Sequence, residues 1–94
     1  MMSRTNMLIR VNGDSMEIAP DTPKGYSLRQ VQTLVGDGTP VDVEMIRIPG
    51  DSENILLVDE AGRMKNLPSN TEATKLARIL IVGTAIVIPI TSMQ

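Results

Sequence analysis

The stretch that decides the fold runs from Ile55 to Ile88. It opens with the apolar run Ile55-Leu56-Leu57-Val58, turns at Asp59-Glu60-Ala61-Gly62, passes through Asn66-Leu67-Pro68-Ser69-Asn70 and ends in the hydrophobic segment 79–88. Short apolar runs divided by clusters of Gly, Pro and Asn are typical of strands joined by turns. This stretch predicts much of the architecture, and none of its residues points to a reaction.

Segment 79–88 is apolar at both sets of alternating positions. A strand with this pattern has a covered sheet on each of its faces, whereas a half-exposed strand alternates apolar with polar residues. We therefore expect the segment at the centre of a sheet, or with one half against a partner chain. Gly83 inside it predicts a bulge or the close approach of another backbone.

The residues before this segment predict a hairpin and a helix. The run 54–58 is a predicted strand, and the turn at 59–62 returns the chain toward a short second strand at 63–66. Ser69 and Glu72 have the spacing of a capping box, and Pro68 precedes them. We expect a helix from there to about Arg78.

The N-terminal half predicts a further hairpin and helix. Asn12-Gly13 lies between the apolar runs 7–11 and 15–19, and both turn residues tolerate positive φ. Ser27 and Gln30 have the spacing of a second capping box, and the helix that they open stops at Gly36. Its apolar face consists of residues at helical spacing, Leu28, Val31, Leu34 and Val35.

Residues 41–48 alternate apolar and polar side chains and predict a half-buried strand. The alternation changes phase as the strand continues through Ile46-Arg47-Ile48, which indicates a bulge. Two acidic pairs, Asp42/Glu44 here and Asp59/Glu60 further on, carry groups used in acid–base chemistry and in binding hard cations. Neither pair has the spacing of a calcium loop, and Asp42 with Glu44 fits the wet face of a sheet, so no metal site is expected.

These segments define an α+β fold with one small domain, a mixed and mostly antiparallel sheet and two short helices. We expect a disordered tail at 1–6, the domain at 7–90 and a C-terminal tail at 91–94. The 94 residues include no Phe, no Trp and one Tyr, so the core is built from aliphatic side chains and Met. Because such a core is thin, we expect a homo-oligomer. The pattern leaves open whether the helices cover one face of the sheet or both.

The composition excludes several classes of chemistry. The chain has no Cys and no His, which removes disulfides, thiolate catalysis, Ser-His-Asp triads and His-based zinc sites. We expect no catalytic residues, no cofactor and no enzymatic activity. The apolar segment 79–90 is well short of the roughly 20 residues that span a bilayer, and no secretory signal is visible, so a cytoplasmic protein is expected.

Charge is unevenly distributed along the chain. The net charge of −2 argues against general nucleic-acid binding, which depends on clustered Lys and Arg. After Glu60, however, a single acid, Glu72, is accompanied by four bases. The predicted helix start near Ser69 offers backbone amides and a positive dipole end to an anion. We therefore predict a site for a small anionic nucleotide ligand at Arg63, Lys65, Asn66, Asn70, Lys75 and Arg78.

A simpler explanation of the same residues remains open. The basic side chains fit a solvated helix face and turn. Ser69 and Glu72 can satisfy the free amides of the helix themselves, and the Glu72 carboxylate repels an anion.

Several of these motifs, taken together, are similar to a known family. Ser27-Leu28 leading to Leu34-Val35-Gly36, the turn Asp59-Glu60-Ala61-Gly62, Leu67-Pro68-Ser69-Asn70 with Ala73, and Ile81-Val82-Gly83-Thr84-Ala85 resemble a small domain-of-unknown-function family, number 3846, over residues 7–87. The family usually has Asn where this chain has Asp59. The resemblance implies a cytoplasmic accessory protein of phages, plasmids and their bacterial hosts, and it supplies no catalytic residues.

Two functions fit these expectations. In the first, the protein is a counter-defence module that sequesters a nucleotide-type signalling ligand. In the second, an apolar or edge-strand surface docks a host protein or another copy of the chain, for inhibition or for a structural role.

Overall fold

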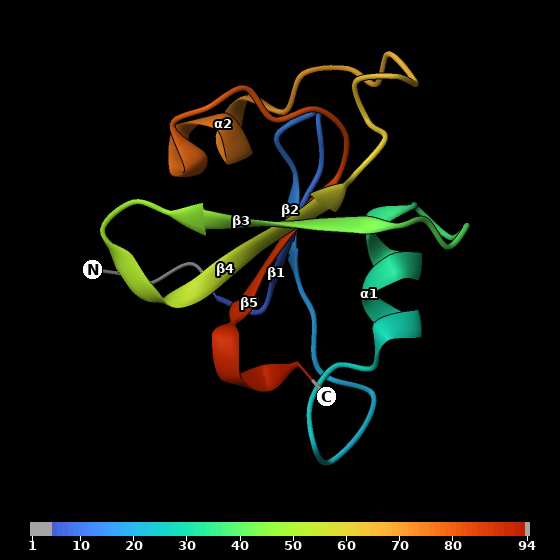
Figure 1. Ribbon diagram of the computed structural model, residues 1–94, viewed down its shortest axis with the longest axis vertical. Coiled ribbons are helices and arrows are strands. Elements are labelled where there is room, and N and C mark those ends of the chain that lie inside the picture. The colour runs from blue at the N-terminus through green and yellow to red at the C-terminus, as the bar shows by residue number, and fades with distance from the viewer. Residues whose placement is uncertain (1–4, 94) are drawn as a thin grey trace.

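The chain forms a five-stranded sheet with one helix on each face. A computed structural model describes residues 5–93 (Figure 1). The elements in chain order are β1 (Met7–Ile9), β2 (Ser15–Glu17), α1 (Leu28–Val35), β3 (Val43–Ile48), β4 (Asp51–Asp59), α2 (Thr71–Ala77), β5 (Ala85–Pro89) and the 3₁₀ turn η1 (Ile90–Ser92). The predicted α+β class with two short helices is confirmed.

The strands lie in the order β2-β1-β5-β4-β3, and all neighbours are antiparallel. The sheet is therefore less mixed than predicted, since the one parallel pairing among the described residues is the isolated bridge Tyr26–Met93. β5 is the central strand, as its two apolar faces predict.

The predicted extent of β5 is wrong at its start. The strand begins at Ala85, and residues 79–84 form a loop with a single bridge, Ser69–Val82. The backbone groups of this loop are bound by segment 68–70, because Asn70 N donates to Ile81 O at 2.8 Å and Gly83 N donates to Pro68 O at 2.8 Å. Gly83 has φ +77, and the Leu67 side chain lies against the place of its missing Cβ. A close approach therefore exists at Gly83, but a side chain makes it and not the backbone that was predicted.

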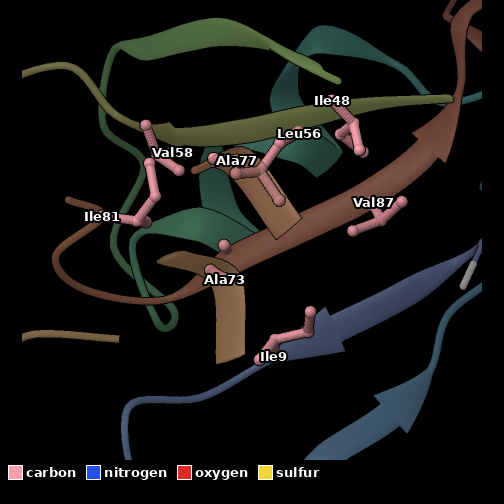
Figure 2. Close-up of a cluster of buried hydrophobic side chains, with 9 residues drawn as sticks. Ile9, Ile48, Leu56, Val58, Ala73, Ala77, Ile81 and Val87 are labelled. Atoms are coloured by element: carbon pink, nitrogen blue, oxygen red, sulfur yellow. The ribbon is translucent and has the colours of Figure 1, made fainter. Parts of the chain in front are cut away.

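The two helices cover opposite faces of the sheet, so the core has two halves. On one face, Ala73 and Ala77 of α2 share a cluster with Ala85 and Val87 of β5, and Figure 2 shows Ile9, Leu56 and Val87 of the strands around α2. On the other face, α1 packs against the alternate residues of β5. We call these halves the α2 cluster (Ile9, Ile48, Leu56, Val58, Ala73, Ala77, Ile81, Ala85, Val87) and the α1 cluster (Leu8, Tyr26, Val31, Val35, Ile55, Leu57, Ile86, Ile88).

This arrangement explains the phase change in β3. Val43, early in the strand, packs against the α1 cluster, whereas Ile46 and Ile48 belong to the α2 side. The apolar set changes face because each end of the strand meets a different helix layer. The irregularity predicted in this strand lies between Arg47 and Ile48, where Ile48 pairs with Asp51 after Arg47 has paired with Ile55.

The N-terminal hairpin is confirmed, but its loop differs from the predicted turn. Gly13 N donates to Arg10 O at 3.0 Å, and Arg10 N donates to Asp14 O at 2.8 Å. Gly13 has φ +94, whereas Asn12 is not left-handed. The loop is therefore a three-residue connection with a left-handed glycine after the turn, the next most common class after the two-residue turns.

Helix α1 is capped by Ser27, whose hydroxyl accepts from Gln30 N at 3.1 Å. The reciprocal half of the predicted capping box is wrong. The Ser27 N–H donates to the Asp21 carboxylate at 2.9 Å, and the Gln30 amide reaches Asp21 N and Ala19 O instead. The hydrogen bonds from the Ser27 hydroxyl and amide hold the pKa of Asp21 below its usual value.

Helix α1 ends at Gly36 for a reason other than left-handed backbone. Gly36 has φ −86, and a Cβ there would lie 1.8 Å from the Thr39 carbonyl oxygen, so only Gly fits. Asp37 is the left-handed residue, with φ 53. Its carboxylate accepts from the Thr84 hydroxyl at 2.9 and 3.0 Å, which ties the end of α1 to the start of β5.

Residues outside the predicted domain limits of 7 and 90 also make contacts with the fold. The Thr5 hydroxyl donates to Asn54 Oδ1 at 2.7 Å, and the Tyr26 hydroxyl donates to Asn6 Oδ1 at 2.7 Å. At the other end, Tyr26 N donates to Ser92 O at 2.6 Å, directly after Gly25, where a Cβ would collide with the same carbonyl. Residues 1–4 and 94 of the predicted tails lie outside the described residues.

Candidate functional site

The predicted second strand at 63–66 is wrong, and a multiple turn takes its place. Lys65 N donates to Ala61 O at 3.0 Å, and Asn66 N donates to Arg63 O at 3.1 Å, so the hydrogen bonds of this segment are local. β4 lies between β3 and β5 and has no free edge for a further strand. Asn66 is left-handed, with φ 56, and ends the turn.

Asn70 is placed inside the molecule. Its Oδ1 accepts from Ala73 N at 3.1 Å, so Asn70 is the N-cap of α2 and the predicted Ser69/Glu72 capping box is wrong. Its Nδ2 donates to Ile9 O at 3.0 Å and to Gly83 O at 2.9 Å, and the residue is 0% exposed. Asn70 therefore has no surface from which to contact a ligand, and its Oδ1 already binds one of the first-turn amides, Ala73 N.

Two of the predicted cationic residues are joined to acids. Lys65 Nζ lies 2.7 Å from Asp59 Oδ2, and the Asp59 side chain is buried. Lys75 Nζ lies 3.3 Å from Glu72 Oε2 on the surface of α2. Each ion pair offsets the charge that an anionic ligand needs, so these two lysines are weak candidates for phosphate contacts.

The remaining predicted residues, Arg63, Asn66 and Arg78, are exposed. Arg63 Nη2 donates to Leu80 O at 3.3 Å, which joins the turn at 61–66 to the loop that follows α2. Arg78 is the C-cap of α2 and is left-handed, with φ 59. The structure thus brings Arg63 next to the 79–82 loop, and it does not gather all six predicted residues around one cavity.

A different group of residues lines a hollow at the β3 side of the molecule. The hollow has a volume of about 270 Å³ and is formed where the turn at 61–66, the 79–82 loop and strand β3 meet. Three large apolar side chains line it and are exposed to solvent: Met64 (86%), Ile79 (52%) and Leu80 (52%). We call these three residues the edge patch.

Charged side chains of both signs surround the edge patch. Glu44 of β3, Glu60 and Arg63 line the same hollow, and Ile46 and Val58 form its apolar floor. β3 is the last strand of the sheet on this side, and within residues 5–93 no strand pairs with its outer edge. The outer edge of β3 thus combines free backbone groups with the neighbouring edge patch.

The residue pattern does not predict the edge patch. Ile79 and Leu80 belong to an apolar run whose later residues are buried, so periodicity placed all of them in the central strand. Met64 lies between Arg63 and Lys65, where a single apolar residue is common on a surface. The left-handed backbone of Arg78 redirects the chain after α2 and keeps Ile79 and Leu80 out of the central strand. The residue pattern does not show this backbone conformation.

Comparison of the chain with protein-family models, with curated proteins and with solved structures finds no match. The resemblance to family 3846 therefore stays a prediction. Neither of the described helices has the length and apolar character that crossing a membrane requires. Within residues 5–93, no cluster of three or more acidic side chains is arranged to hold a metal ion.

Proposed function

We propose that the protein acts by binding another protein, without catalysis, and that the edge patch is its docking surface. The observation that carries the proposal is the convergence of Met64, Ile79 and Leu80 on one hollow from two segments far apart in the sequence. Large apolar side chains exposed together on a soluble domain are typical of interaction sites. Isolated exposed apolar residues, such as Leu28 on α1, need no such explanation.

The neighbouring edge of β3 supports the same proposal. An open strand edge offers backbone donors and acceptors to an extended segment of a partner, while adjacent pockets receive its side chains. Met45 is exposed on one face of β3, and Ile46 is half-buried on the other. We therefore propose a partner that adds an extended segment to β3 and places an apolar side chain among the residues of the edge patch.

The small-ligand alternative keeps some support from Arg63, Asn66 and Arg78, which are exposed and carry donors suited to phosphate. Two contacts expected for the ligand are missing. Asn70 is buried, and its side chain already binds Ala73 N at the start of α2. A counter-defence role, whether by sequestering a nucleotide or by inhibiting a host protein, rests on the resemblance to family 3846. The homo-oligomer, too, stays a prediction.

The test compares capture of a host protein by three forms of the chain. In the first variant, Ile79→Ser and Leu80→Ser are combined, and in the matched control Leu28→Ser removes a side chain of similar exposure (56%) on α1. We expect the wild type and Leu28→Ser to retain the same partner. The double variant should bind that partner at least ten-fold more weakly, which corresponds to about 1.4 kcal/mol of binding free energy. Circular dichroism checks that all three forms are folded.

Native mass spectrometry of the same samples separates the alternatives. Equal capture by all three forms would overturn the edge patch as the docking surface. A stoichiometric adduct with a cyclic or ADP-ribose nucleotide, lost in Arg63→Glu and unaffected by the Ile79/Leu80 double variant, would instead establish the small-ligand function. A dimer that dissociates in the double variant would identify a second copy of the chain as the partner.

A further inference from the structure

We infer that Asn12 is a modification site at which the chain deamidates without an enzyme. The chain has five Asn residues, and Asn12 alone is followed by Gly. Asn12 and Gly13 are both exposed at the tip of the β1–β2 hairpin. The inference is independent of the proposed docking function, since the hairpin belongs to the β2 edge of the sheet and the edge patch to the β3 side.

The local geometry leaves the reacting atoms accessible. Deamidation begins when the backbone nitrogen of the next residue attacks the side-chain carbonyl carbon, and a side chain on that residue hinders the approach. Gly13 has none, and no atom from outside residues 12–14 lies within 4 Å of the position that a Cβ would take. The Gly13 amide is held by a single hydrogen bond to Arg10 O at 3.0 Å. A bond at an exposed hairpin tip opens far more readily than one in the core.

The other Asn residues are worse placed. Asn70 is fully buried with both amide hydrogens bonded, and Asn54 is buried and bonded to Asp51. Asn6 and Asn66 are followed by Met and Leu, whose side chains crowd the attacking nitrogen. The structure and the sequence thus select the same residue.

The reaction consumes one water and releases one ammonia, and it needs no other reactant. The Gly13 nitrogen forms a bond to Asn12 Cγ and loses its proton, the bond from Cγ to Nδ2 breaks, and Nδ2 leaves as ammonia. The five-membered succinimide that results adds one water at either of its carbonyl carbons. Hydrolysis at one carbonyl gives Asp at position 12, and hydrolysis at the other gives isoaspartate, in which the backbone runs through the former side chain.

The product changes the contacts of the hairpin loop. Asn12 Nδ2 now donates to Asp14 Oδ2 at 3.0 Å, and Asn12 Oδ1 accepts from Asp14 N at 2.9 Å. A carboxylate at position 12 replaces the donor, so two negative groups face each other and the charge of the chain falls from −2 by one unit. Isoaspartate also adds a methylene to the backbone between Arg10 and Asp14, whose mutual hydrogen bond fixes the register of β1 with β2.

The strand most affected is β2. It pairs with β1 alone and all three of its residues are exposed, whereas β1 is also held by β5. We therefore expect modification at Asn12 to loosen β2 from the sheet and to leave the rest of the fold in place.

The experiment follows the intact protein during storage in a mildly alkaline buffer. Trypsin cleaves after Arg10 and Lys24 and releases residues 11–24, in which Asn12 is the single Asn; residues 66–75 contain Asn66 and Asn70 and serve as the internal control. We expect peptide 11–24 to show the mass change of replacing NH₂ by OH and to separate into two products on chromatography. The fraction of peptide 66–75 that carries this mass change should be at least ten-fold smaller.

Two results would overturn the inference. One is an unmodified peptide 11–24 from the folded protein under conditions where the same peptide, isolated, deamidates, since the fold would then protect Asn12. The other is equal modification of peptide 66–75. The variant Asn12→Asp, which mimics one product, tests the consequence: amides of Ser15–Glu17 should exchange with deuterium faster than in the wild type, and those of Ala85–Pro89 should be unchanged.

Discussion

Asn70 joins three parts of the chain through one side chain. It caps α2 through Ala73 N, binds the last carbonyl of β1 at Ile9, and binds the Gly83 carbonyl just before β5. All three of these hydrogen bonds are inside the protein, where a group left without a partner costs far more than in water. This explains why a fully buried polar residue is tolerated at this position.

We predict that Asn70→Ala lowers the free energy of unfolding by about 3 kcal/mol, because two carbonyls lose their donor and α2 loses its cap. Ser69→Ala is the matched control, since Ser69 is exposed and makes no side-chain cap, and we expect it to change stability by less than about 0.5 kcal/mol. Urea denaturation of both variants measures the difference. If Ser69→Ala proved the more damaging of the two, Ser69 would be the cap.

At the scale of elements, the sequence predicts what depends on local chemistry. The N-terminal hairpin and the Ser27 start of α1 are each determined by residues within a few positions of one another, and the structure contains both. The two-sided apolar pattern of β5 also predicts its central place, because burial on both faces leaves no room for polar residues.

The sequence predictions are wrong where segments distant in the chain determine the local structure. The strand predicted at 63–66 fails because β5, which lies later in the chain, occupies the edge of β4 that this strand required. The start of β5 was placed too early because loop 79–84 binds segment 68–70, and an apolar loop has the same composition as a strand. The same limitation hides the site, since Met64, Ile79 and Leu80 meet only in the folded chain.

The end of α2 offers a test at this scale. Arg78 is the C-cap in the left-handed region, where an L-residue with a side chain is strained and Gly is not. We predict that Arg78→Gly raises the free energy of unfolding by about 0.5–1 kcal/mol. Lys75→Gly, inside the same helix, should lower it by about 1 kcal/mol. Thermal and urea unfolding distinguish the two, and a loss of stability in Arg78→Gly would contradict the left-handed cap.

At the scale of the whole molecule, one sheet supports two separate apolar layers. Adjacent residues of β4 and β5 point into the α1 cluster and the α2 cluster alternately, so a change in one layer alters the strands that line the other. The single aromatic residue, Tyr26, belongs to the α1 cluster and is 0% exposed. Its burial raises the pKa of its hydroxyl and makes it a natural reporter of that layer.

We predict that Leu56→Ala, in the α2 cluster, lowers stability by about 3 kcal/mol. The loss should appear equally in the fluorescence of Tyr26, on the other face, and in far-UV circular dichroism, because the two layers unfold together. Leu28→Ala serves as the control and should leave both transitions close to the wild type, because Leu28, which was predicted on the apolar face of α1, is 56% exposed. A Tyr26 transition that stayed in place while the circular dichroism shifted would show that the layers unfold separately.

The central position of β5 has a consequence for synthesis on the ribosome. β1 with β2, and β3 with β4, are local hairpins that can form as they emerge, yet neither hairpin touches the other without β5 between β1 and β4. Until residue 89 has left the exit tunnel, the nascent chain carries two half-sheets with open edges and uncovered apolar faces. Completion of the fold therefore waits for β5, and the delay before β5 leaves the ribosome sets how long those edges remain open to chaperones or to misassembly.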